Sequence, residues 1–200
     1  MSTRTGTLLL VSGPSGSGKT TLCRRLTDEK EVVYATSCTT RAPRKGEVNH
    51  VDYHFLTPEE FRSRIDDGLF FEYAEVHGHY YGTLKTEVIN HLTNGSDVVI
   101  DIDVQGADFI RSCDDAIIQK ALITLFVMPH SDAELRKRLT TRGTDTEEII
   151  ELRMSNAHDE IKHWKKYDYR LLSTDKETDY ALFKSIIHTE RLRISRLNNI

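Results

Sequence analysis

Residues 13–20 read GPSGSGKT and match the pattern G-x-x-x-x-G-K-[ST] in full. The apolar run Thr7–Ser12 (TLLLVS) precedes this stretch, and a segment of helical character from about Lys19 to Glu29 follows it. A short apolar run beside a glycine-rich turn is typical of a buried strand in a parallel sheet. Strand, glycine-rich loop and helix in this order predict a phosphate-binding loop.

The residue types of this loop suit a nucleoside triphosphate. Glycines let the backbone fold closely around phosphates, so that successive N–H groups and the helix N-terminus point at the anion. Lys19 adds a positive charge for the β- and γ-phosphates, and the Thr20 hydroxyl is placed to bind Mg²⁺. We expect the nucleotide to contact Gly13, Pro14, Ser15, Gly16, Ser17, Gly18, Lys19, Thr20 and Thr21.

The rest of the chain alternates strand and helix signals. Apolar runs predict further strands at residues 32–36, 98–103, 121–128 and 169–172. Capping patterns and apolar spacing predict helices at residues 57–68, 84–92, 131–141 and 147–164, and in the tail from about residue 177. This alternation predicts an α/β fold with a mostly parallel sheet flanked by helices.

Two carboxylates, Asp101 and Asp103, end the strand expected at residues 98–103. The carboxyl ends of parallel strands face the ligand crevice of an open α/β sheet. We therefore expect Asp101 to join Thr20 at a Mg²⁺ ion, partly through water.

Bulk composition limits the classes of protein that fit. The chain has 200 residues, 38% hydrophobic and 29% charged, which suits one soluble domain with a core. A net charge of -4 argues against nucleic acid as a main partner. The run Leu8–Val11 is too short for a signal peptide or a membrane span. Three widely spaced cysteines suggest no disulfide or zinc pattern, so we expect a cytoplasmic protein without a membrane partner.

A polar region after the second expected strand carries a more specific pattern. Residues 37–49 read SCTTRAPRKGEVN and are followed by Asp52-Tyr53. Four further blocks follow in order: FEYA at 71–74, YYGT at 80–83, DIDVQG at 101–106, and KRL at 137–139 with RGT at 142–144. Over about residues 7–169 the chain thereby resembles the guanylate kinases, ATP:GMP phosphotransferases among the P-loop nucleoside monophosphate kinases.

The resemblance implies one domain over residues 1–200 with three parts. The core would comprise residues 1–36, 96–130 and 157–200, the inserted GMP-binding lobe residues 37–95, and the helical lid residues 131–156. The implied substrates are ATP, with Mg²⁺, and GMP, while acceptance of dGMP stays open. The implied assembly is a monomer or a homodimer.

The resemblance also assigns roles to single residues. Arg41, Arg44, Tyr53 and Tyr81 would hold the phosphate of GMP, which suits arginine forks and tyrosine hydroxyls. Glu72 would accept hydrogen bonds from guanine N1–H and the N2 amine, with Asp103 on the amine side. Ser37 and Thr83 would donate to guanine O6. The catalytic cations would be Lys19, Arg41, Arg138, Arg142 and Arg153.

Two alternative functions remain at this stage. An inactive guanylate kinase-like module that binds proteins usually has a damaged phosphate loop, whereas this loop is intact. A kinase for AMP, dTMP or dGMP is the other alternative, and Glu72 favours guanine. The chain departs from the family at Ser173-Thr174, where an asparagine–aspartate pair is common, which leaves donor selectivity open. Cys38, His77 and His79 receive no role.

Overall fold

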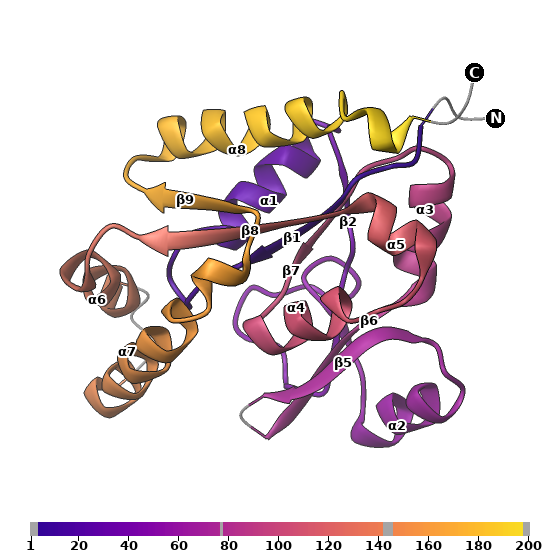
Figure 1. Ribbon diagram of the computed structural model, residues 1–200. Coiled ribbons are helices and arrows are strands. Elements are labelled where there is room, and N and C mark those ends of the chain that lie inside the picture. Colours follow the sequence, from indigo (N-terminus) through magenta and orange to yellow (C-terminus); the bar gives the residue numbers. More distant parts are fainter. Residues whose placement is uncertain (1–3, 77, 142–145, 198–200) are drawn as a thin grey trace.

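The central layer of the molecule is a parallel sheet (Figure 1). The computed structural model describes residues 4–76, 78–141 and 146–197. The sheet has five strands in the order β2-β7-β1-β8-β9, and every neighbouring pair is parallel. Its strands are β1 (Leu8–Ser12), β2 (Val33–Tyr34), β7 (Val98–Asp101), β8 (Leu122–Pro129) and β9 (Tyr169–Ser173). The predicted α/β fold with a mostly parallel sheet is confirmed.

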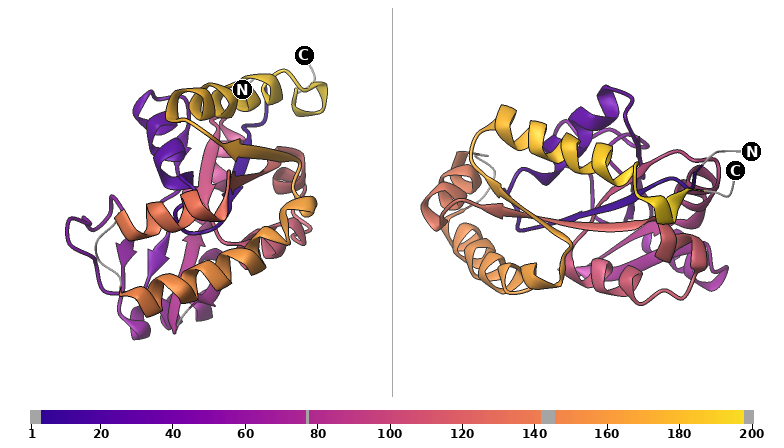
Figure 2. Two further views of the ribbon diagram at one scale, coloured as in Figure 1. Left: turned by 90° about the vertical axis from the view of Figure 1, so that its left-hand side faces the viewer. Right: turned by 45° about the horizontal axis from the view of Figure 1, so that its top comes forward.

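Helices cover both faces of this sheet, as Figures 1 and 2 show. Strand β1 is buried throughout, and its side chains alternate between two apolar clusters. Leu9 and Val11 pack toward α1 (Lys19–Asp28) and α8 (Lys176–Glu190), whereas Leu8 and Leu10 pack toward the opposite face. That second face is covered by α3 (Ile89–Thr93), α4 (Val104–Arg111) and α5 (Ala116–Ala121). The arrangement holds the loop after β1 rigidly at the sheet's carboxyl edge.

A second, smaller sheet has the strand order β4-β3-β6-β5. It consists of β3 (Cys38–Thr39), β4 (His54–Phe55), β5 (Phe70–Val76) and β6 (His79–Leu84), and helix α2 (Pro58–Asp66) packs on it through Phe61. The predicted capping box at Thr57 and Glu60 begins α2. The helix predicted over residues 84–92 is wrong at its start. Leu84 instead pairs with Phe70, and a 3-10 turn, η1 (Lys85–Glu87), separates it from α3.

Helices α6 (Asp132–Thr141) and α7 (Glu147–Ile161) project to one side of the core, as Figure 2 shows. They share an apolar cluster of their own, formed by Leu135, Leu139, Ile150, Met154 and Ala157. This cluster reaches the phosphate loop, because a Cβ at Gly16 would lie 3.2 Å from Cδ1 of Leu135. The two helices are therefore packed against the loop that the motif predicts.

Two helices end earlier than the apolar spacing predicts. Helix α7 ends at Ile161 and is followed by a 3-10 turn, η2 (Trp164–Lys166). Helix α8 ends at Glu190, and another 3-10 turn, η3 (Ile194–Arg196), follows it. The chain turns back after Glu190 because the Arg196 guanidinium is buried against the Glu190 carboxylate. Within the described ranges, no helix has the length and apolarity that crossing a membrane requires.

Candidate active site

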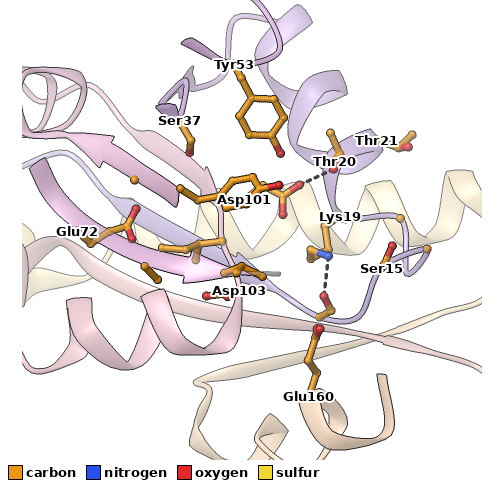
Figure 3. A pocket seen from close by; sticks show the side chains of 18 of the residues that line it. Ser15, Lys19, Thr20, Thr21, Ser37, Tyr53, Glu72, Asp101, Asp103 and Glu160 are labelled. Carbon is orange, nitrogen blue, oxygen red and sulfur yellow. Dashed lines mark hydrogen bonds between the residues drawn. The ribbon is translucent and has the colours of Figure 1, made fainter. Parts of the chain in front are cut away.

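A cavity of about 300 Å³ opens where the carboxyl ends of β1 and β7 face the hairpin β5–β6 (Figure 3). It joins two groups of predicted residues that are far apart in sequence. Lys19, Thr20 and Ser15 lie at one end and Glu72 and Ser37 at the other. The predicted residues that line the cavity are Gly13, Ser15, Gly16, Gly18, Lys19, Thr20, Thr21, Ser37, Arg44, Tyr53, Glu72, Tyr81, Asp101 and Asp103.

The phosphate loop has positive φ angles, which favour glycine, at three positions, one of them Gly16 at φ 88°. Gly13 has φ 145°, and a Cβ there would lie 2.2 Å from the carbonyl oxygen of Val127. Gly18 has φ 100° and immediately precedes α1. The Lys19 ammonium donates to the carbonyl oxygens of Gly13 at 2.6 Å and Pro14 at 3.2 Å. Its charge is thereby held over the loop.

The predicted metal ligands meet at the same end of the cavity. The Thr20 hydroxyl donates to Oδ2 of Asp101 at 2.5 Å (Figure 3). A hydroxyl and a carboxylate are oxygen donors of the kind that Mg²⁺ prefers, and Mg²⁺ usually takes its remaining ligands from water and phosphates. Within the described part of the chain, no group of three or more histidine, cysteine, aspartate or glutamate side chains is placed to hold a metal ion.

Asp103 does not lie on the strand where the sequence placed it. Strand β7 ends at Asp101, and Asp103 is the N-cap of α4, where its Oδ1 accepts from the Gly106 N–H at 2.8 Å. The reason is local, because an aspartate side chain that accepts from the first turn of a helix favours helix initiation over strand continuation. Asp103 still lines the cavity, on the side of Glu72.

A buried carboxylate and two hydroxyls form the other end of the cavity. Glu72 on β5 pairs with Thr83 on β6, and only 4% of Glu72 is exposed. The hydroxyl of Ser37 lies 3.4 Å from that of Thr83, which is fully buried behind the cavity wall. Burial raises the pKa of Glu72 to about 7, the nearby Asp103 charge adds to this, and hydrogen bonds from Thr83 oppose it. Without a ligand, ionisation of the Glu72 carboxyl therefore costs free energy.

The two arginines of residues 41–44 lie in different positions. Arg44 lines the cavity, whereas the Arg41 guanidinium donates to Glu47 Oε1 at 2.9 Å and lies 5.4 Å from the Tyr53 ring centre. The Arg44 backbone N–H donates to Glu47 Oε2 at 2.7 Å, so Glu47 holds the turn that carries both arginines. The Tyr53 ring packs against Tyr81, and burial, with the Asp101 charge next, raises the pKa of Tyr53 to about 12. Tyr53 therefore keeps its proton and remains a hydrogen-bond donor.

Two of the three predicted lid arginines contact the phosphate loop from α6 and α7. Arg138 donates to the Ser17 carbonyl oxygen at 3.3 Å and to the Ser173 hydroxyl at 3.1 Å. Arg153 donates to the Ser15 hydroxyl at 3.3 Å. Arg142 lies outside the described residues. Ser173, where the sequence departs from the family pattern, is thus a partner of Arg138.

Sequence reasoning missed Glu160, which lines the cavity from the end of α7. Its side chain points toward the phosphate loop in Figure 3. Burial raises the pKa of Glu160 to about 7, Lys19 opposes this shift, and Asp103 adds to it. Glu160 follows Arg153 by seven residues and so lies on the same helix face, which is the one signal that the sequence offered.

Two of the residues to which the sequence assigned no role, Cys38 and His79, do not line the cavity. The Cys38 thiol is buried in the small cluster with Phe61, and burial raises its pKa to about 11. His77 lies outside the described residues, and His79 begins β6.

Comparison with known proteins identifies the family of this chain. The family model described as guanylate kinase matches residues 5–190. A guanylate kinase of Maricaulis maris (strain MCS10) is 48% identical over 193 residues, covering 95% of this chain and 86% of the relative. One of Clostridioides difficile (strain 630) is 41% identical over 202 residues, covering 100% of this chain and 96% of the relative. The crystal structure of guanylate kinase from Anaplasma phagocytophilum superposes with a TM-score of 0.78 at 30% identity, covering 97% of this chain and 90% of that one. The chain belongs to the guanylate kinase family.

Proposed function

We propose that this protein transfers the γ-phosphoryl group of ATP to GMP, giving ADP and GDP. The observation that carries the proposal is the single cavity that joins an intact phosphate loop to the buried carboxylate of Glu72. The two ends suit the phosphates of a donor and the base of an acceptor. Membership of the guanylate kinase family supports the same reaction.

Guanine fits the buried end by its pattern of donors and acceptors. Its N1–H and N2 amine are donors on one edge, which the Glu72 carboxylate accepts together, with Asp103 beside it. The Ser37 hydroxyl lines the cavity and would donate to O6. The Thr83 hydroxyl is buried and bonded to Glu72, so it would have to give up that bond to donate to O6 as well. Adenine offers a lone pair at N1 and would be repelled by the carboxylate. Buried polar groups left without partners make the wrong base costly, by up to ~10⁴-fold in favourable sites.

The reaction needs no nucleophile from the protein, because the phosphate oxygen of GMP attacks. The protein's contribution is to position both phosphates and to neutralise the charge that moves between them. Lys19 would serve the donor phosphates, and Arg41 and Arg44 with Tyr53 and Tyr81 the acceptor phosphate. For this, Arg41 exchanges part of its contact with Glu47 for the ligand. Arg138, Arg142 and Arg153 would close over the transferred group.

Mg²⁺ would be held by Thr20 and, partly through water, by Asp101. The ion would supply positive charge to the donor phosphates. The described residues supply only this hydroxyl and carboxylate pair, so the ion would enter together with the donor nucleotide.

The three-part division is proposed with the function: core at residues 1–36, 96–130 and 157–200, GMP-binding lobe at 37–95, and lid at 131–156. The separate sheet of β3–β6 and the separate apolar cluster of α6 and α7 support the division. Two of its boundaries do not follow the packing, because α3 lies in the lobe range but packs on the core sheet, and α7 continues past residue 156 to Ile161. A cytoplasmic location, assembly as a monomer or homodimer, and acceptance of dGMP stay predictions.

The test is ADP formation from ATP and Mg²⁺ with GMP, AMP, dTMP and UMP offered separately. We expect turnover with GMP and with none of the other acceptors. A Lys19→Ala variant should lose this turnover but bind GMP as the wild type does. Equal turnover with AMP would contradict the guanine assignment. Absence of turnover with every acceptor would contradict the kinase proposal and favour a protein-binding module.

A further inference from the structure

Gly106, in the first turn of α4, lies directly against the carboxylate that the proposed function assigns to guanine. A Cβ built at Gly106 would lie 3.2 Å from Oε2 of Glu72, and 2.5 Å and 2.6 Å from Cδ1 and Cγ1 of Ile102. The first distance requires Glu72 to shift by a few tenths of an ångström. The other two are overlaps that force Ile102 to move, and this partly buried side chain lines the cavity, so it can move into the cavity.

The backbone gives no reason for a glycine at this position. Gly106 is helical and has no positive φ, in contrast to the glycines at positions 13 and 18. Alanine is intrinsically favoured over glycine in a helix. The missing side chain is therefore explained by space, and the space is occupied by Ile102 and the carboxylate of Glu72.

Gly106 also holds the second carboxylate at this end of the cavity. Its N–H donates to Oδ1 of Asp103 at 2.8 Å, which fixes the orientation of that side chain and leaves Oδ2 for a ligand. Ile102 itself lines the cavity, so a displaced Ile102 moves within the space that a base would occupy or presses on Glu72. Gly106 thus lies beside Glu72, Asp103 and Ile102, three of the residues that shape the base end of the cavity.

We propose that Gly106 is a positioning residue for purine specificity: its bare Cα and its N–H set Glu72 and Asp103 at the spacing that a 2-amino-6-oxopurine requires. The inference rests on the proposed function, in which these carboxylates accept from the guanine base. The chemical group that depends most on this spacing is the 2-amino group, which both carboxylates approach.

The experiment compares GMP with inosine monophosphate, which lacks only the 2-amino group, in wild type and in Gly106→Ala. The wild type is expected to prefer GMP in kcat/KM. In Gly106→Ala, kcat/KM for GMP divided by that for inosine monophosphate should fall by about tenfold or more. The fall should come from a higher KM for GMP, while KM for ATP stays within about twofold of the wild-type value. Gln105→Ala, exposed in the same helical turn, is the matched control and should keep the wild-type ratio.

A second variant tests the cause of the loss. Ile102→Ala removes both atoms that overlap the added Cβ, so Gly106→Ala/Ile102→Ala should regain most of the preference measured in Ile102→Ala alone. A Gly106→Ala protein that folds and keeps the wild-type ratio would overturn the inference, as would a double variant that regains nothing. A wild type without preference for GMP would instead refute the proposed base recognition. If Gly106→Ala fails to fold, the double variant is compared with Ile102→Ala alone. The remaining 3.2 Å approach of the added Cβ to Glu72 Oε2 should keep its ratio below that of Ile102→Ala, and an equal ratio would overturn the inference.

Discussion

Replacing Glu72 with glutamine should stabilise the fold at neutral and alkaline pH while it removes guanine recognition. Glu72 is 4% exposed, and burial raises its pKa from 4.5 to about 7. The empty site therefore holds an ionised carboxylate only at a cost in folding free energy. Glutamine keeps the shape of the side chain and one acceptor oxygen but carries no charge, so the cost of burying a carboxylate disappears. It also loses the second acceptor oxygen, which guanine recognition needs.

The pH dependence follows from the direction of the shift. Below pH 4.5 the carboxyl is protonated in both states and contributes nothing. Between pH 4.5 and about 7 the unfolded chain ionises while the folded chain keeps its proton, so wild-type stability falls with rising pH. At 1.36 kcal/mol per pKa unit, the full difference is about 3 kcal/mol above pH 7. Glu72→Gln should therefore differ little from wild type near pH 4.5 and gain about 3 kcal/mol at pH 8.

Urea denaturation without nucleotides at pH 5 and pH 8 measures this difference, with Glu75→Gln on the same strand as the exposed control. Parallel assays should show kcat/KM for GMP reduced at least about 100-fold in Glu72→Gln. A stability gain of equal size at both pH values would refute the reasoning about burial. Unchanged kinetics with GMP would remove Glu72 from base recognition.

Three further predictions concern the metal, the lid and the core. Thr20→Val should raise the Mg²⁺ concentration for half-maximal rate, because the ion loses its hydroxyl ligand; an unchanged Mg²⁺ titration would contradict this. Arg138→Ala should lower kcat by about 100-fold with little change in KM. Arg136→Ala, whose guanidinium pairs with Glu147 and Glu151 instead of the phosphate loop, should not; equal effects would contradict the assignment. Asp97→Asn should lower the free energy of unfolding by about 3 kcal/mol without changing KM, because buried Asp97 accepts hydrogen bonds from two arginines and a backbone N–H. An unchanged melting temperature would contradict this prediction.

The parts of the fold that the sequence predicted are those with local signals. The apolar run before the phosphate loop predicts β1. Similar apolar runs predict β7 and β8, which are largely buried in the same parallel sheet. The second sheet was missed because β3 and β4 have only two residues each, and because neither β5 nor β6 alternates strictly between buried and exposed positions. β5 and β6 form a hairpin, but β3 pairs with β6 from far away in the sequence, and periodicity does not reveal such pairing.

In the site, too, local sequence patterns predicted some residues and missed those that depend on contacts across the fold. The motif located the phosphate loop, and the resemblance to the family supplied residues such as Glu72 that no local pattern singles out. Neither indicated Glu160, because its place in the cavity depends on how α7 packs against the core. Nor did they indicate Gly106, whose lack of a side chain matters only because β5 brings Glu72 beside it.

The central claim is that one cavity seats the donor phosphates and the guanine base together. It is tested most directly by calorimetric titration with a compound that joins adenosine and guanosine through a chain of phosphates. The account predicts one molecule bound per chain, displaced by either ATP or GMP, and weakened by both Lys19→Ala and Glu72→Gln. The account would be contradicted if only one of the two nucleotides displaced the compound. It would also be contradicted if either substitution left the binding affinity unchanged.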